Sequence, residues 1–168
     1  MVEPSVPARP APPGTADERT QLEGFLEQYR AIVLRKTDGL DDELARRAEL
    51  ASGTTVAGLL RHLRWVEEAW FVEALQGSAR PQWRDTDPQW QFRPGTESVA
   101  ELRAAYAAAC DRSREIAARH ALDDTGHNPR MGEVSLRWIH LHMIEELARH
   151  AGHLDILREQ LDGSVGFD

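Results

Sequence analysis

Apolar residues recur at intervals of three and four along four segments of this 168-residue chain, which is the periodicity of helices that bury one face. The four predicted helices cover residues 16–36, 56–75, 98–120 and 135–161. No segment shows the apolar–polar alternation of a strand of useful length, and the chain has no internal repeat. The sequence therefore predicts an all-α four-helix bundle in which successive helices alternate in direction, with longer crossovers at two loops.

The remaining segments divide the chain into an arm and one domain. Residues 1–15 are rich in Pro and Ala and predict a disordered or extended N-terminal arm, followed by a single domain over residues 16–168. A loop of about twenty residues, Gly77–Gly95, contains Trp83, Trp90 and Phe92, and such a length favours a functional or docking role. A second loop, Asp123–Glu133, precedes the last helix.

The last predicted helix carries polar groups on its core-facing side. At about 100° per residue, these groups are His142, Glu146, His150 and His153. The apolar members of the same face are Ile139, Met143, Leu154, Leu157 and Leu161. Imidazoles and a carboxylate are costly to bury unless a partner satisfies them, and a divalent metal is one such partner. Spacing alone is equally compatible with a buried Glu–His pair that holds the bundle in register.

A metal held by Glu146 and His150, one turn apart, requires at least one ligand from a facing helix. Among the seven histidines, only His62 lies within the body of another predicted helix, at the margin of its apolar face. Glu145 is rotated by about 100° from Glu146 and is expected to stay hydrated. His140 is expected to point away from the inner face.

Three protein ligands with one open position are typical of catalytic metal sites. The open side is predicted at one end of the bundle, beneath the two loops. His142 and His153 are candidates for a fourth ligand or for outer groups that orient the ligands, and Glu73 is a further outer candidate. Packing of the open end of the bundle is the alternative role for His153. A set of two histidines and one carboxylate suits Zn first, with Ni, Fe and Mn as alternatives.

Composition restricts the partners. A net charge of −8 with no basic run argues against nucleic acid, and no apolar stretch is long enough to span a membrane. The first residues lack a signal-peptide core, so a soluble cytoplasmic protein is expected. The single cysteine, Cys110, excludes an internal disulfide and is predicted to be a buried, inert thiol. Trp65 and Ile144 fall on outward faces and suggest a homodimer.

Two segments resemble a known superfamily. The run G-L-L-R-H-L-R-W-V-E-E-A-W-F, together with the later M-I-E-E-L-A-R-H-A-G-H-L-D-I-L-R, is similar to the DinB/YfiT-like superfamily and to its mini-circle-type branch. The resemblance covers nearly everything after residue 16. It implies a four-helix bundle with a metal held by one ligand from the second helix and two from the last. Most members use three histidines, whereas His62, Glu146 and His150 resemble the His/Glu/His set of mycothiol-dependent maleylpyruvate isomerase.

The resemblance also implies a chemistry. Characterised relatives use the metal to activate a low-molecular-weight thiol, such as mycothiol or bacillithiol, which reacts with a small electrophile in a transfer or an isomerisation. In this setting Trp70 and the loop with Trp83 and Trp90 are candidate walls of a substrate cleft, and Arg130 is a candidate partner for a carboxylate. Packing in the core for Trp70 and exposure in a loop for Arg130 are the simpler alternatives.

Two other functions remain open at this point. The first is a metal-dependent hydrolase with a metal-bound water as nucleophile and Glu73 or His142 as the base. The second is a non-enzymatic, metal-stabilised bundle that acts in a stress response. Cofactor and partners under the preferred hypothesis are a divalent metal, a low-molecular-weight thiol and a small electrophile.

Overall fold

The computed structural model describes residues 11–79 and 92–165, and in this part of the chain the protein is mainly helical. Its helices are α1 (Glu18–Lys36), α2 (Asp42–Arg46), α3 (Val56–Glu67), the π-helix η1 (Glu68–Leu75), α4 (Val99–Ala117) and α5 (Leu136–Asp162). One hairpin consists of β1 (Thr125–Asn128) and β2 (Gly132–Ser135). The mainly α class predicted from the sequence is confirmed. None of the helices in the described ranges is long and apolar enough to cross a membrane.

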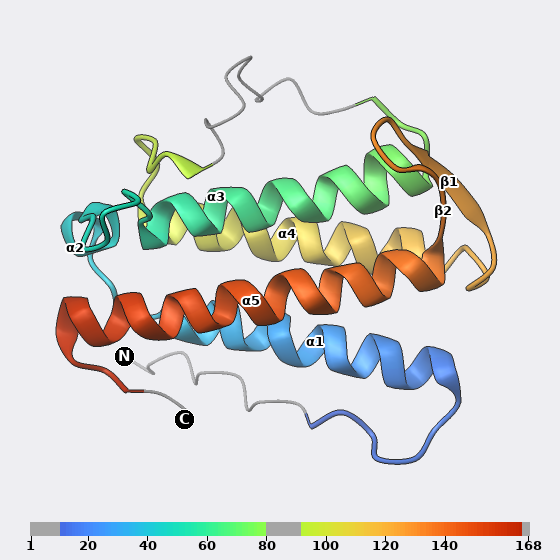
Figure 1. The fold of residues 1–168 in the computed structure, drawn as a ribbon, viewed down its shortest axis with the longest axis horizontal. Coiled ribbons are helices and arrows are strands. Elements are labelled where there is room, and N and C mark those ends of the chain that lie inside the picture. The colour runs from blue at the N-terminus through green and yellow to red at the C-terminus, as the bar shows by residue number, and fades with distance from the viewer. Residues whose placement is uncertain (1–10, 80–91, 166–168) are drawn as a thin grey trace, which may run out of the picture.

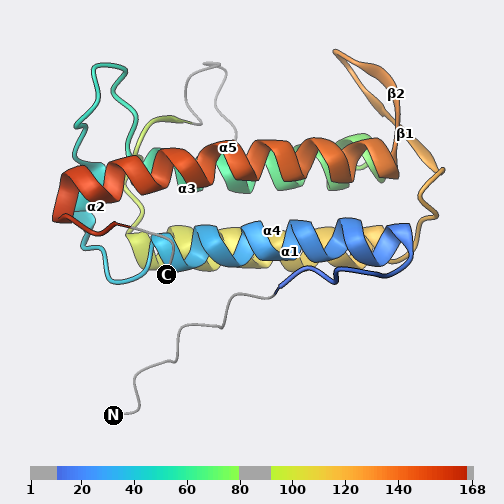
Figure 2. The same cartoon turned by 60° about the horizontal axis from the view of Figure 1, so that its bottom comes forward.

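Four long helices lie side by side in two layers, with α3 and α5 in one layer and α1 and α4 in the other (Figures 1 and 2). Helix α3 continues directly into η1. Most ends coincide with local signals in the sequence. The side chains of Asp17, Thr55, Ser98 and Ser135 each accept a backbone N–H at the start of a helix. Gly163, with φ of 77°, ends α5 in the left-handed conformation.

The directions of the helices differ from the predicted alternation, because α3 and α4 run the same way (Figure 1). The chain therefore has to return from the end of η1 to the start of α3 before α4 begins. Gly58, near the start of α3, lies so close to the backbone of Phe92 that a Cβ would be 2.0 Å from the Phe92 carbonyl oxygen. Topology thus accounts for the length of the Gly77–Gly95 connection. Its residues Trp83 and Trp90 lie outside the described residues, as does most of the predicted N-terminal arm.

The second half of the predicted 56–75 helix is π-helical, which shifts the register of its side chains. In α-helical periodicity Trp70 continues the buried face formed by Leu59, Leu63 and Val66. A turn closed by i to i+5 hydrogen bonds contains more residues than an α-turn, so the core position moves along the chain. Phe71 occupies that position with 0% exposure, while Trp70 is only partly buried. Trp70 therefore packs against the edge of the core and does not continue the fully buried face that α-helical periodicity predicts.

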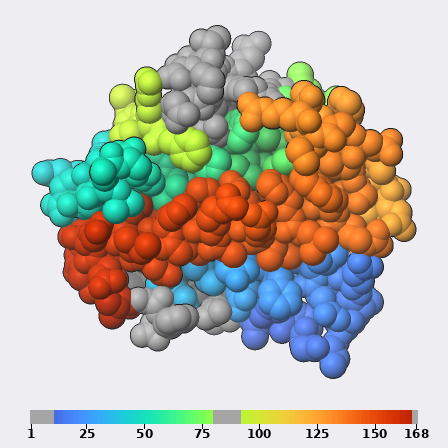
Figure 3. All heavy atoms as spheres, in the orientation of Figure 1, coloured from blue at the N-terminus to red at the C-terminus, as the bar shows by residue number. Residues whose placement is uncertain are grey.

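A β-hairpin replaces the predicted Asp123–Glu133 loop. The turn is closed by the side chain of Asn128, whose Oδ1 accepts the backbone N–H groups of Arg130 and Met131. The hairpin packs against η1, because Gly126 has no side chain and a Cβ there would be 2.0 Å from the Ala74 carbonyl oxygen. The turn is thereby held next to the π-helix, and Figure 3 shows the hairpin at one end of the face that α5 crosses.

A buried ion pair joins α1 to the end of α3. The guanidinium of Arg30 donates to both carboxylate oxygens of Glu67, at 2.8 and 2.6 Å, and to Glu27 at 2.6 Å. Arg30 and Glu67 are buried. Burial alone would lower the pKa of Arg30, but Glu67 raises it well above the usual value, so the pair stays charged. Sequence reasoning missed this pair.

The Glu67 carboxylate also accepts a hydrogen bond from the Cys110 thiol, with 3.7 Å between Cys110 Sγ and Glu67 Oε1. Burial and the neighbouring Glu67 raise the pKa of the Cys110 thiol well above its usual value. Cys110 is therefore a protonated, buried thiol, as the sequence predicted.

Substitution of Glu67 by Gln should lower the free energy of unfolding by about 3–5 kcal/mol, because it leaves the Arg30 charge buried without its carboxylate. Urea titration of the full chain measures this. Glu145→Gln is the matched control, since it removes an exposed carboxylate that pairs with Arg149, and it should cost at most about 1 kcal/mol. Equal losses of unfolding free energy in the two variants would show that the Arg30–Glu67 ion pair does not contribute more than a surface pair.

Candidate metal centre

Three side chains from α3 and α5 converge on one point between these helices. Glu146 Oε1 lies 2.8 Å from His62 Nε2 and 3.2 Å from His150 Nε2. One ligand atom from each residue lies within 4.8 Å of the other two. The helix positions explain the convergence, because Glu146 and His150 are one turn apart on the inner face of α5 and α3 packs against that face.

The donor set fits a divalent metal. At ligand distances of about 2.0–2.2 Å, the ligands of a tetrahedral ion lie about 3.4 Å apart. The two observed Glu–His separations are slightly shorter than this, so small movements of the side chains would admit an ion. Two imidazole nitrogens and one carboxylate oxygen are ligands that Zn and its neighbours accept. His62, Glu146 and His150 could therefore hold a metal.

The surroundings of Glu146 favour its charged form. Hydrogen bonds from His150 and His62 hold the pKa of the Glu146 carboxyl well below its usual range, in spite of partial burial. His62 and His150 are buried, and Glu146 is only slightly exposed. The cluster thus offers a negative charge and two imidazoles in a poorly solvated place, which strengthens their attraction for a cation.

The outer candidates lie in different surroundings. His153 Nδ1 is 3.2 Å from His150 Nδ1, which leaves the Nε2 of His150 directed at Glu146. This is the arrangement by which an outer group orients a ligating imidazole. His142 instead stacks on Trp138 and lies edge-on to Trp70. Neither His142 nor Glu73, which is half-buried on η1, belongs to the cluster of donor atoms among the described residues.

Two aromatic residues flank His62. The ring of Phe92 stacks on the imidazole at 4.3 Å between centroids, and Trp65 lies tilted at 6.0 Å. The sequence placed Phe92 in the Gly77–Gly95 loop, for which a functional or docking role was expected, but it did not predict the contact with His62. The available signal was Gly58, one turn before His62, because a glycine inside a helix often marks the close approach of another backbone.

A cavity of about 530 Å³ lies beside Trp65, between η1 and the hairpin turn. Trp70 lines it from η1, and Arg130 and Met131 line it from the turn. The structure thus brings Trp70 and Arg130, the two residues singled out for substrate contact, into one cavity. Trp65 lines this cavity and also flanks His62, which makes the cavity a neighbour of the His62–Glu146–His150 cluster.

Three expectations from the sequence need correction. The cluster lies midway along α3 and α5 rather than at an end of the molecule. His140 does not point away from the core: it is buried, its Nδ1 donates to the Leu136 carbonyl oxygen and its ring meets Phe71. The other helices pack around α5 more fully than one apolar stripe suggests. Trp65 and Ile144 are half-buried against the core, so they are not the exposed anchors that suggested a dimer.

The hydrated position of Glu145 is confirmed, since 58% of its side chain is exposed and it pairs with Arg149.

A mainly helical protein with a possible His/Glu/His metal site is the class that the fold and the cluster define. The family model for mycothiol-S-transferase matches residues 21–163, and the chain belongs to this family. The predicted resemblance to DinB/YfiT-like proteins is confirmed at this level. No curated protein matches the chain.

Replacing Glu146 with Gln should weaken metal binding by more than about 100-fold, since an outer-group change already costs 10–100-fold and this change removes a ligand charge. Elemental analysis of untagged protein and a competitive chelator titration measure the effect. Glu145→Gln, one residue away but hydrated, should retain the metal content of the parent protein. Equal metal content in the two variants would show that Glu146 is not a ligand.

Proposed function

We propose that this protein is a metal-dependent S-transferase that joins a low-molecular-weight thiol of the mycothiol type to a small electrophile. The observation that carries the proposal is the convergence of His62, Glu146 and His150 in a chain of the mycothiol-S-transferase family. Zn is the proposed metal, because the site combines two imidazoles with one carboxylate and the proposed transfer reaction involves no redox change at the metal. Ni, Fe and Mn are the alternatives.

The chemistry requires a thiolate. A bound divalent ion lowers the pKa of a thiol that it binds and keeps the sulfur in its reactive, deprotonated form. His62, Glu146 and His150 would hold the ion, and His153 would keep the His150 ring oriented through the contact between their Nδ1 atoms. In the transfer the sulfur forms a bond to an electrophilic carbon, the leaving group departs with the bonding electrons, and the thiol proton is released to solvent.

The cavity beside Trp65 is the proposed place for the body of the substrates. Trp70 supplies an apolar wall, and Arg130 supplies a cationic group that can meet a carboxylate or another polar acceptor. Such contacts raise the rate by holding the reacting atoms in place.

Finer assignments also belong to the proposal. The His/Glu/His set supports the mini-circle-type branch within a DinB/YfiT-like four-helix bundle, and an isomerase that uses the same thiol is the closest alternative reaction. A cytoplasmic location fits a thiol that must remain reduced. A hydrolase would require a base near the cluster, and a non-enzymatic bundle would require no thiol at all, so the two tests below separate these functions.

Mycothiol should stabilise the metal-loaded protein. A ligand at 100 times its Kd contributes about 2.7 kcal/mol when it binds only the folded state. For a domain of this size the Tm should rise by about 5–10 °C. The S-methylated thiol is the control and should give a smaller shift, because its sulfur cannot become a thiolate. Differential scanning fluorimetry measures the shift, and formation of a thioether from monobromobimane tests transfer. No shift at millimolar thiol would exclude the S-transferase and leave the hydrolase.

Arg130→Ala should raise the KM for the thiol or the electrophile about tenfold or more and leave kcat within about threefold, because Arg130 binds without touching the metal cluster. Arg119→Ala, an exposed arginine outside the cavity, is the control. Steady-state kinetics with metal content measured in parallel provide the readout. Loss of metal from the Arg130 variant, or an unchanged KM, would contradict the assigned role.

A further inference from the structure

The cavity beside Trp65 has walls of two kinds. Trp65 of α3, Trp70 of η1 and Met131 of the hairpin turn give it an apolar surface, whereas Asn128 and Arg130 of the same turn are polar. All five residues are half-buried or exposed, so a ligand in the cavity can reach them. The volume of about 530 Å³ is typical of small-molecule sites.

The tryptophan wall is already ordered in the free protein. The Trp70 ring lies 5.1 Å from that of Trp138 and 4.7 Å from the imidazole of His142, which meets it edge-on. A side chain held by two other rings loses little conformational freedom when a ligand binds. Aromatic pairs also gain more than their buried area provides, so two tryptophans in one wall favour an aromatic ligand.

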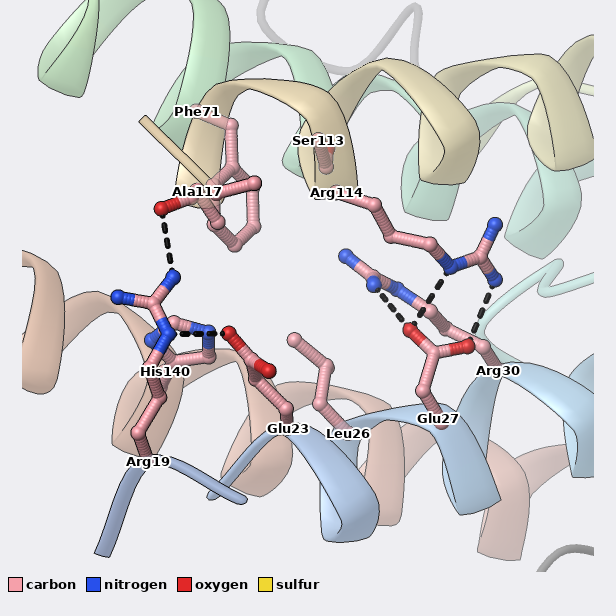
Figure 4. A pocket seen from close by; sticks show the side chains of 11 residues that line it. Arg19, Glu23, Leu26, Glu27, Arg30, Phe71, Ser113, Arg114, Ala117 and His140 are labelled. Atoms are coloured by element: carbon pink, nitrogen blue, oxygen red, sulfur yellow. Dashed lines mark hydrogen bonds and ion pairs between the residues drawn. The ribbon is translucent and has the colours of Figure 1, made fainter. Parts of the chain in front are cut away.

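The arginines at a second cavity, between α1 and α4, are paired with carboxylates (Figure 4). Glu27 accepts hydrogen bonds from the guanidinium groups of Arg30 and Arg114, and Arg19 donates to Glu23. An anionic ligand would have to displace these carboxylates. The cavity between α1 and α4 therefore does not favour an anion.

Arg130 offers an unpaired cation at the cavity beside Trp65. Its guanidinium takes part in no hydrogen bond or ion pair within the part of the chain that the structure describes. The turn that carries it is held by Asn128, whose Oδ1 accepts the backbone N–H groups of Arg130 and Met131. The amide nitrogen of Asn128 thus remains as a second donor. A carboxylate is the acceptor that matches a guanidinium best, because the two can form paired hydrogen bonds.

We propose that this cavity binds an aromatic carboxylate and that a compound of this class is the electrophile of the transfer. The ring lies against Trp65 and Trp70 under the Met131 side chain, and the carboxylate binds Arg130. Trp65 also flanks His62, so the ring is held beside the His62–Glu146–His150 cluster. The inference rests on the proposed function only in making the ligand a substrate, because binding itself requires neither thiol nor turnover.

The test uses 2-naphthoate, an unreactive aromatic carboxylate, in isothermal titration calorimetry with the metal-loaded full chain. The expected Kd is about 0.1–1 mM for a ligand of this size. 2-Naphthamide has the same shape without the charge and should bind about tenfold more weakly, the effect of one charge-assisted hydrogen bond. Absence of naphthoate binding at millimolar concentration would overturn the proposal. Equal binding of the amide would rule out a carboxylate site, and tighter binding of myo-inositol would show that the tryptophans select a polyol.

Arg130→Gln should weaken naphthoate binding about tenfold and leave the affinity for 2-naphthamide within about twofold, because only the charged ligand uses the guanidinium. Arg119→Gln, at an exposed arginine outside the cavity, should change neither affinity. Unchanged naphthoate binding, or an equal loss for both ligands, would reject the assigned role of Arg130.

Met131→Glu locates the ring and the carboxylate together. The new carboxylate lies next to Arg130 and should weaken naphthoate binding about tenfold by competition and repulsion. The side chain is 58% exposed, so the Tm should not change. Ile156→Glu, at a residue 50% exposed on α5 and outside the cavity, is the matched control and should bind naphthoate as the parent does. Equal affinities in these two variants would place the ligand elsewhere.

Glu146→Gln separates this inference from the metal-dependent function. It should bind naphthoate as the parent does, because the cavity and the His62–Glu146–His150 cluster have no residue in common. Loss of naphthoate binding in this variant would place the carboxylate on the metal and contradict its contact with Arg130. Naphthoate binding without any thiol-dependent rise in Tm would instead reject the S-transferase and retain the aromatic carboxylate site.

Discussion

The buried pair between Arg30 and Glu67 is the constraint on which the arrangement of the helices depends. A charged guanidinium and a charged carboxylate can remain in the interior only if their hydrogen-bonding geometry is satisfied, so they fix α1 against the end of α3. Glu67 is the last residue of α3, and the π-helix begins at the next residue. The pair therefore fixes the junction at which the register of this helix changes.

Because of the change of register, Trp70 and Phe71, which are neighbours in the sequence, lie in different surroundings. Before the junction, His62 faces α5 and meets Glu146 and His150 there. After it, Phe71 takes the core position, and Trp70 is released to line the cavity beside the hairpin. A continuous α-helix would leave Trp70 in the core. The π-helix thus provides a cavity wall close to the cluster without displacing His62, in agreement with the frequent occurrence of π-helical turns at functional sites.

The sequence predicted those features that depend on local chemistry. The positions of the long helices and the polar stripe on the last helix follow from spacing, and the cluster of His62, Glu146 and His150 follows from the stripe together with the family resemblance. Features that depend on partners distant in sequence could not be predicted in this way. No pattern near residue 67 indicates a π-helix, and the parallel course of α3 and α4 depends on contacts such as that between Gly58 and Phe92.

The histidines of α5 show why helical spacing alone could not predict the partner of each side chain. His140, His142 and His150 belong to α5, yet each has a different type of partner: a backbone carbonyl, two tryptophan rings and a carboxylate. Helical periodicity gives the direction of a side chain, but the chemistry of the group that it meets comes from another element. Because α1, α4 and η1 pack around His140, burial lowers the pKa of its imidazole. Because α3 brings His62 to Glu146, the same helix, only a few residues later, contributes two members of the candidate metal-ligand cluster.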